Sequence, residues 1–280
     1  MNAKAQRLID ENDWGAVSHA FGPADDLLEL FEGLVSSTPK TRDEALYELH
    51  GNVWHQGTVY SASAPAARVL LALVEDEATP GRAGILGLLQ CIATGTSYHE
   101  VHQGGQLKAT RPQKEMDELV ATERTWVAKA HESVREGLPI LMRCLEDSVV
   151  DVREAASFAV SAFPEDASSV VPGVVARLRV ESERQTRLGL ILALGQLGRG
   201  NSGVEQQLLD LLRANGPERM CAAIGLARIL GPGCPSKVEA ALREAWANSN
   251  DWEAVVESTY WNAEMDYEAR IEEALELIRK

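Results

Sequence analysis

The chain has 280 residues and a mass of 30.5 kDa, a length that suits one or two globular domains. It carries 42 acidic and 27 basic side chains, and its formal net charge of −15 argues against a general attraction to nucleic acid or anionic lipid. Hydrophobic residues make up 45% of the chain, enough for a core, yet no apolar run approaches the roughly 20 residues of a membrane span. The first residues lack the apolar stretch of a secretory signal, so we expect a cytoplasmic protein that is not bound to a membrane.

The cysteines give no sign of a metal or disulfide framework. A zinc site needs closely paired ligands, and the chain has no Cys-x-x-Cys pair. Buried free thiols behave as small hydrophobic side chains, so we expect reduced cysteines, no metal and no cofactor. The four residues are Cys91, Cys144, Cys221 and Cys234.

Helical periodicity recurs along the chain in five similar segments, each headed by an arginine. Apolar residues follow the arginine at offsets of about 3, 7 and 10, as Leu190, Leu194 and Leu197 follow Arg187. These offsets lie on one face of an α-helix, so each segment offers a buried stripe, which only Asn52 interrupts. The five arginines are Arg42, Arg82, Arg153, Arg187 and Arg219.

A second apolar helix precedes each of these segments, and a proline often stands near its start. The repeating unit is therefore a helical hairpin. A single hairpin cannot cover its own apolar face, but a stack of hairpins forms a continuous core. The sequence predicts an all-α protein, a right-handed α-solenoid of about six HEAT-like hairpins with an inserted loop and long helix. The first helices are expected at 27–35, 69–74, 138–145, 170–178 and 204–212.

The stretch LPILMRCLEDSVVDVREAASFAV (138–160) resembles a HEAT repeat. The later units resemble the short HEAT-like repeats of bacterial proteins, a class also seen in phycobilisome lyase-type sequences. This resemblance implies a solenoid fold and says little about function. Only Asp151 precedes its arginine at the family spacing, so the pattern does not predict a continuous Asp–Arg ladder.

We expect residues 1–280 to form one domain. The ends of a solenoid need atypical capping elements. The inserted loop at 95–113 has 19 residues, and a loop of that length inside a compact domain usually has a function or is disordered. The expected parts are an N-terminal cap (1–23), repeats 1–2 (24–94), an inserted loop and helix (95–134), repeats 3–5 (135–233), and a degenerate repeat with a C-terminal cap (234–280).

Candidate binding residues cluster in the connections between hairpins. In a solenoid these connections emerge on one edge, so segments 18–24, 54–65 and 95–113 should lie together, with His50 nearby. WHQGTVYSASAPA (54–66) resembles a segment of actinobacterial HEAT-repeat proteins, which implies no chemistry. A second, acidic and aromatic region lies near the C-terminus. The candidates are Trp54, His55, Gln56, Tyr60, Tyr98, His99, His102, Gln103, Trp252 and Trp261.

Three interpretations of the histidine-rich edge are open. Its side chains could cap helix ends and satisfy backbone groups. They could form a recognition patch for a protein, with Trp54 and the tyrosines as rigid anchors. They could also build a metal or catalytic centre from His50, His55, His99 and His102 with Glu100, although His99 and His102 lie in a loop whose spacing fixes no ligand geometry.

Charge is unevenly distributed along the chain. Residues 167–233 carry eight arginines and no lysine against five acids, while the flanking regions are acidic. The arginines either pair within the fold or line a groove for an acidic ligand. Acidic flanks disfavour binding to duplex nucleic acid.

The chain lacks the common catalytic motifs, among them HExxH, Gly-x-Ser-x-Gly and a phosphate-binding glycine loop. Our leading hypothesis is a non-catalytic scaffold that binds a protein partner, as a regulatory adaptor or a toxin-neutralising immunity protein. A partner that binds the acidic surface is expected to be basic. The alternative is a small-molecule- or metal-dependent enzyme, lyase-like, that uses the histidine edge.

Overall fold

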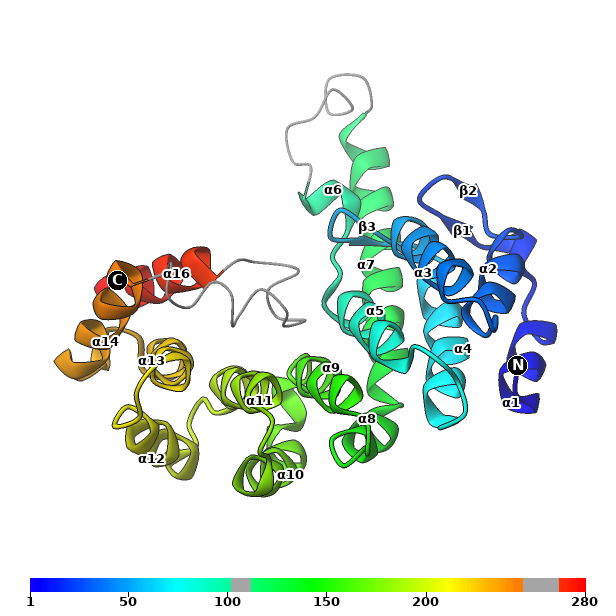
Figure 1. The fold of residues 1–280 in the computed structure, drawn as a ribbon. Coiled ribbons are helices and arrows are strands. Elements are labelled where there is room, and N and C mark those ends of the chain that lie inside the picture. The colour runs from blue at the N-terminus through cyan, green and yellow to red at the C-terminus, as the bar shows by residue number, and fades with distance from the viewer. Residues whose placement is uncertain (102–111, 249–266) are drawn as a thin grey trace. The chain divides into compact units, whose positions relative to one another are not determined.

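The computed structural model describes residues 1–101, 112–248 and 267–280. Helices dominate these ranges, and the expected all-α repeat solenoid is confirmed (Figure 1). The backbone forms two compact units, residues 1–140 and 141–280. The expectation of a single domain stays a prediction.

Residues 1–140 hold two helical hairpins, α2–α3 and α4–α5, together with helices that cover them. α1 lies against α4, and the long α7 lies against both α4 and α5 (Figure 1). The bounds are α1 Ala3–Asp10, η1 Trp14–Ala16, β1 Ser18–His19, β2 Gly22–Pro23, α2 Leu27–Leu34, α3 Pro39–Val53, β3 Trp54–His55, β4 Thr58–Val59, α4 Ser63–Glu75, α5 Arg82–Thr94, α6 Tyr98–Val101 and α7 Gln113–Arg135.

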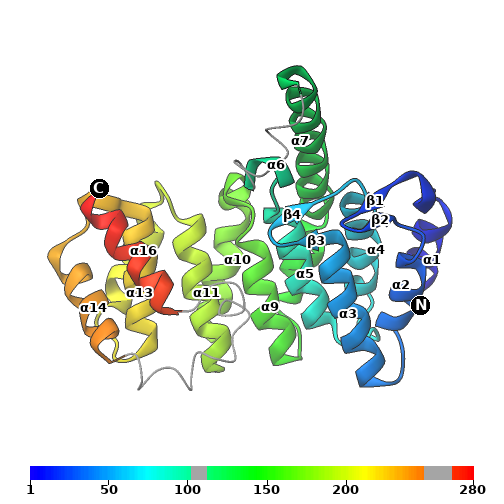
Figure 2. The ribbon, with the colours of Figure 1, turned by 90° about the horizontal axis from the view of Figure 1, so that it is seen from above.

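Residues 141–280 are more regular. The second helices of the hairpins, α9, α11 and α13, stack side by side, with α10 on α11 and α12 on α13 (Figures 1 and 2). The bounds are α8 Leu138–Cys144, which crosses the unit boundary, α9 Val150–Val160, η3 Pro164–Asp166, α10 Ala167–Val180, α11 Arg184–Leu197, α12 Ser202–Leu211, α13 Pro217–Leu230, η4 Gly231–Gly233, α14 Ser236–Ala247 and α16 Tyr267–Arg279.

The apolar stripes that follow the arginines form the core. On α11, Leu190, Leu194 and Leu197 are all buried, as the repeat predicts. Burying a leucine side chain contributes about 1.5–3 kcal/mol to the free energy of folding, so the burial of these stripes is the main term that favours stacking of the hairpins. The one polar exception, Asn52, is also buried, and its carbonyl accepts a hydrogen bond from the Ala20 amide at 3.0 Å.

Two glycines bring α11 and α13 into direct backbone contact. A Cβ built on Gly195 would lie 2.5 Å from the Cα of Gly225, closer than any real side chain permits. Glycine inside a helix costs about 1 kcal/mol relative to alanine. At this crossing it allows the two helices to approach closely.

The repeated arginines of residues 141–280 join successive hairpins. Arg153 donates to Glu181 at 2.8 Å, and Arg187 donates to Glu218 at 2.6 Å. Arg219 lies 3.1 Å from Glu244. The repeated arginines therefore pair with glutamates of the next hairpin. We call these Arg–Glu pairs the ladder of residues 141–280.

Glu181 is the most enclosed carboxylate of this ladder, with a fully buried side chain. It accepts hydrogen bonds from Arg153 and Arg177 and from the backbone amides of Ser182 and Glu183. Burial alone would raise the pKa of Glu181, but these donors outweigh it and lower the pKa to about 2. The carboxylate is therefore charged in the fold at neutral pH.

The long helix α7 follows the inserted loop, in the second part of the segment 95–134. The terminal helix α16 buries Ile271 and Ala274 against α13 and α14. At the other end, Asn2 caps α1 and donates to the carbonyl of Ala72 on α4 at 2.8 Å. All four cysteines are free thiols. Within the described ranges, no helix combines the length and apolar character needed to cross a membrane.

Candidate functional site

Three connections of residues 1–140 lie side by side at one end of the helices (Figure 2). Backbone hydrogen bonds join the first to the second, from Ala62 N to Ser18 O at 3.0 Å. Others join the second to the third, from Val59 N to Thr96 O at 3.1 Å and from Thr96 N to Gly57 O at 2.8 Å. We call residues 18–23, 54–60 and 95–101 the loop edge. The structure brings together the described parts of the segments that solenoid geometry places on one edge; residues 102–111 lie outside the described ranges.

The first two connections form short antiparallel hairpins, which the sequence did not predict. β1 pairs with β2, and β3 pairs with β4 around the two-residue turn Gln56–Gly57. Both turn residues have positive φ, 50° for Gln56 and 87° for Gly57, as in a type I′ turn. A glutamine in this conformation is strained, and strained residues cluster at functional sites.

His19 fixes the conformation of the first hairpin. Its buried ring accepts the Phe21 amide at Nδ1 (3.0 Å), so Nε2 carries the proton and donates to Asp26 at 2.9 Å. The two bonds together select the neutral Nε2–H tautomer. As a result, the turn that carries Phe21 has a defined shape.

Phe21 is the main apolar group of the loop edge. Its side chain is 70% exposed, and its ring lies edge-on to that of His55 at a centroid distance of 5.2 Å. Trp54 is half-buried and lies edge-on to His50 at 6.0 Å. Tyr98 is 37% exposed. Aromatic side chains of three connections therefore share one surface.

The third connection is tied to α7 through polar contacts. Glu123 on α7 accepts both the backbone amide of His99 (3.0 Å) and its Nδ1 proton (2.7 Å). Arg124 binds the carboxylate of Glu100 at 2.7 Å. Hydrogen bonds from Arg124 and Ser97 lower the pKa of Glu100. The inserted helix thus fixes the position of α6 within the loop edge.

Two other groups on this surface are turned toward the fold. Thr58 donates its hydroxyl to the His55 carbonyl at 2.7 Å, so the Tyr60 hydroxyl donates to Thr58 Oγ1 at 2.8 Å. Burial raises the pKa of Tyr60 and lowers the pKa of His50. Tyr60 and His50 therefore stay uncharged at neutral pH and support the edge from within.

The structure places the predicted site residues in three groups. Trp54, His55, Gln56 and Tyr98 lie at the surface of the loop edge. Tyr60 and His99 lie there too, but their side chains bind Thr58 and Glu123. The remaining four lie outside the described residues: His102, Gln103, Trp252 and Trp261.

Sequence reasoning missed three residues of this surface. Phe21 stands between Ala20 and Gly22 and just before Pro23, and a large aromatic side chain in such a short turn segment was the available signal. Glu123 and Arg124 are 24 residues away from the groups that they bind, on a helix whose register against the loop no local pattern reveals.

The described part of the chain contains no group of three or more His, Cys, Asp or Glu side chains arranged to hold a metal ion. The three described imidazoles of the predicted metal centre each have a separate neighbour. His50 lies against Trp54, His55 against Phe21, and His99 is bonded to Glu123.

No protein-family model and no curated protein matches the chain. Among solved structures it is similar to an engineered protein of the Northeast Structural Genomics Consortium, with 18% identity and a TM-score of 0.49 over 91% of this chain and 97% of that one. A designed armadillo repeat protein in complex with the peptide (KR)4 has 16% identity and a TM-score of 0.48 over 91% of this chain and 100% of that one. A computationally designed armadillo repeat protein for modular peptide recognition has 16% identity and a TM-score of 0.46 over 90% and 99%. The chain has no family assignment, and its place among HEAT-repeat proteins stays a prediction.

Proposed function

We propose that the chain is a protein-binding scaffold without catalysis of its own, and that the loop edge is the surface that binds. The observation that carries this proposal is the exposed Phe21 ring on a rigid turn. Binding hot spots favour large, rigid side chains, because little conformational entropy is lost when they are covered. The turn around Phe21 is already ordered by His19, and His55 supports the ring from the neighbouring hairpin.

The charge around this surface favours a basic partner. Residues 8–39 contain seven acidic side chains and neither lysine nor arginine. Asp25 and Glu29 are exposed there, and so is Leu28, at 38%. Opposite charge speeds the encounter of two proteins, and an apolar anchor slows their separation. A regulatory adaptor and an immunity protein that neutralises a basic toxin domain both fit this description.

A comparison of two exposed aromatic residues tests the proposal. We immobilise the wild-type chain and two variants, Phe21→Ser and Tyr47→Ser, and expose each to a lysate of the native host. Tyr47 is the matched control, because it is 79% exposed on α3 and lies outside the loop edge. We expect a stoichiometric protein to bind the wild type and Tyr47→Ser, and to be reduced at least tenfold on Phe21→Ser.

That partner is then purified and its affinity measured with each variant. A loss of more than 1 kcal/mol confined to Phe21→Ser is the result expected of a hot spot. Equal binding by all three proteins would place the interface elsewhere. A small molecule that copurifies in place of any protein would count against the scaffold.

One observation favours the enzyme alternative. The His99–Glu123 pair, with 2.7 Å between Nδ1 and Oε1, resembles the carboxylate–imidazole arrangement that orients a general base. His50 and His55 lie against aromatic rings and make no comparable pair. Among His50, His55 and His99, only His99 therefore has a carboxylate that could orient it as a base.

Metal analysis separates the two functions at little cost. The enzyme alternative predicts bound metal or ligand that His55→Ala and His102→Ala remove while the Tm stays nearly constant. The scaffold predicts no stoichiometric metal in the wild type. If both variants simply unfold at lower temperature, the two histidines serve the fold.

A further inference from the structure

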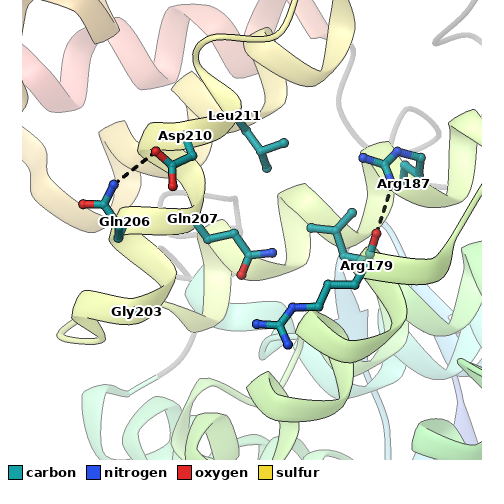
Figure 3. Close-up of a pocket in the computed structure, with 8 residues that line it drawn as sticks. Arg179, Arg187, Gly203, Gln206, Gln207, Asp210 and Leu211 are labelled. Atoms are coloured by element: carbon teal, nitrogen blue, oxygen red, sulfur yellow. Dashed lines mark hydrogen bonds between the residues drawn. The ribbon is translucent and has the colours of Figure 1, made fainter.

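A groove of about 570 Å³ lies between α10 and α12, the first helices of two successive hairpins (Figure 3). This volume falls within the range of about 300–1,000 Å³ typical of ligand sites. It belongs entirely to residues 141–280, and the loop edge contributes nothing to it. The groove is lined by Leu178, Arg179, Arg187, Gly203, Gln206, Gln207, Asp210 and Leu211.

One of the two arginines in the groove is already used by the fold. Arg187 donates to Glu218 through Nε at 2.6 Å and through Nη2 at 3.3 Å. Its Nη1 donates to the carbonyls of Leu178 and Glu181, both at 3.0 Å. The Glu218 carboxylate raises the pKa of Arg187 further. Its charge is therefore neutralised and its donors are largely occupied.

Arg179 is different. It is exposed at the end of α10, and among the residues that the structure describes it has neither a hydrogen-bond nor a carboxylate partner. Figure 3 shows its guanidinium group turned into the space between α10 and α12. Most other arginines of the basic stretch have carboxylate partners: Arg177, Arg187, Arg213, Arg219 and Arg228.

The opposite wall, on α12, is made of neutral amides with one acid. Gln207 is half-buried and faces Arg179 across the groove (Figure 3), and the described structure gives its amide no partner. Gln206 donates to Asp210 at 3.2 Å, and Asp210 also lies 3.5 Å from Arg213. A glutamine amide offers one acceptor and two donors, which match the C=O and N–H of a peptide backbone.

We propose that this groove binds an extended peptide segment carrying a carboxylate, which Arg179 holds through its fork of donors. Gln207 pairs with the peptide backbone, and the apolar side chains of Leu178 and Leu211 face its neighbouring residues. The carboxylate lies on the α10 wall, because Asp210 would repel it from the α12 wall. The site is independent of the loop edge and of any partner bound there.

Three capped peptides test this site by NMR chemical-shift titration of the full chain. The first is acetyl-Ala-Leu-Glu-Leu-Ala-amide, the second has Gln in place of Glu, and the third has Gln and a free C-terminal carboxylate. We expect the Glu peptide to bind roughly tenfold more tightly than the capped Gln peptide, since a charge-assisted pair is lost. The third peptide shows whether a chain terminus can supply the carboxylate.

Arg179→Gln should abolish the preference for a carboxylate while leaving the unfolding midpoint unchanged. Arg184→Gln is the matched control, because Arg184 is exposed nearby but does not line the groove, and it should behave as wild type. Phe21→Ser should leave peptide binding intact, which separates this site from the proposed function. The proposal is overturned if no peptide shifts the groove resonances, if Glu and Gln peptides bind equally, or if Arg179→Gln keeps the preference.

Discussion

Residues 141–280 join their hairpins through arginine–glutamate pairs between helices, whereas residues 1–140 join theirs through the backbone of their loops. In the second unit Arg153 and Arg187 each bind a glutamate of the next hairpin. In the first unit Arg42 donates to the Ser36 carbonyl at 2.8 Å, and it has no carboxylate partner within the described ranges. In this unit, backbone hydrogen bonds between connections, such as the bond from Val59 N to Thr96 O, join one hairpin to the next.

The difference shows that one repeat register can support two kinds of surface. Where side-chain pairs hold the stack, the connections stay short and the space between helices is left open for a ligand. Where the connections hold the stack, they become rigid hairpins that can display an aromatic side chain. The following predictions test each half of this comparison, from the largest expected effect to the smallest.

Removing the central carboxylate of the ladder should have the largest effect. Glu181→Ala leaves Arg153 and Arg177 without their enclosed partner, and breaking a buried pair costs about 3–5 kcal/mol. Urea unfolding measures this loss. The control is Glu239→Ala, which breaks an exposed pair with Arg243 and should cost less than about 0.5 kcal/mol. Similar losses in both variants would contradict the ladder's role.

The same carboxylate should make stability depend on pH in acid. The pKa of Glu181 is about 2 in the fold against an ordinary 4.5, so the unfolded chain binds the extra proton between these values. The stabilisation is complete above about pH 5 and is lost as the pH falls toward 2, by about 3 kcal/mol in all. Glu181→Gln should lose this dependence.

Other carboxylates also titrate in this range, so the readout is the difference between wild type and Glu181→Gln. The gap in unfolding free energy should narrow steadily from pH 5 to pH 2.5. A gap that stays constant would mean that the pKa of Glu181 is not lowered.

The contact between α6 and α7 should contribute a moderate amount. Glu123→Ala leaves the His99 amide and its ring N–H without their acceptor in a largely buried place, which costs about 1–3 kcal/mol. Glu118→Ala on the same helix is the control, because its side chain is exposed. Faster amide exchange of residues 98–101 in Glu123→Ala alone would locate the effect in the loop edge.

The strained turn should give the smallest change, in the opposite direction. Gln56→Gly relieves a positive φ and should stabilise the chain by about 0.5–1 kcal/mol. Gly57→Ala places a side chain at φ 87° with open space around it, so only the backbone is affected, and it should cost about 1 kcal/mol. If both changes are neutral, the turn is not held in this conformation in solution.

The helical part of the fold could be predicted because it depends on periodicity. The positions after Arg187 repeat after Arg219, where Ala222 and Leu226 are buried and Ile229 is half-buried. The sequence also indicated a long helix within the inserted segment 95–134, where α7 lies. Such patterns reflect each helix's own buried face, which the sequence records locally.

The candidate site was less predictable because its contacts join residues far apart in the chain. Solenoid geometry placed His55 and Tyr98 on one edge, but neither hairpin followed from it. The hairpin around Gln56 has a residue that type I′ turns rarely use, so the usual Asn-Gly signal was missing. The anchor Glu123 and the exposed Phe21 depend on how α7 and the first turn meet their neighbours, which only coordinates reveal.

The glycine crossing of α11 and α13 has a consequence for the ligand groove of the same unit. Neither Gly195 nor Gly225 has a side chain at this crossing, and the absence of a side chain allows the two hairpins to lie this close together. α10 rests on α11 and α12 on α13, so this spacing also sets how far Arg179 stands from Gln207. Gly195→Ala would therefore push α11 and α13 apart and widen the groove, although Gly195 is not one of the residues that line it.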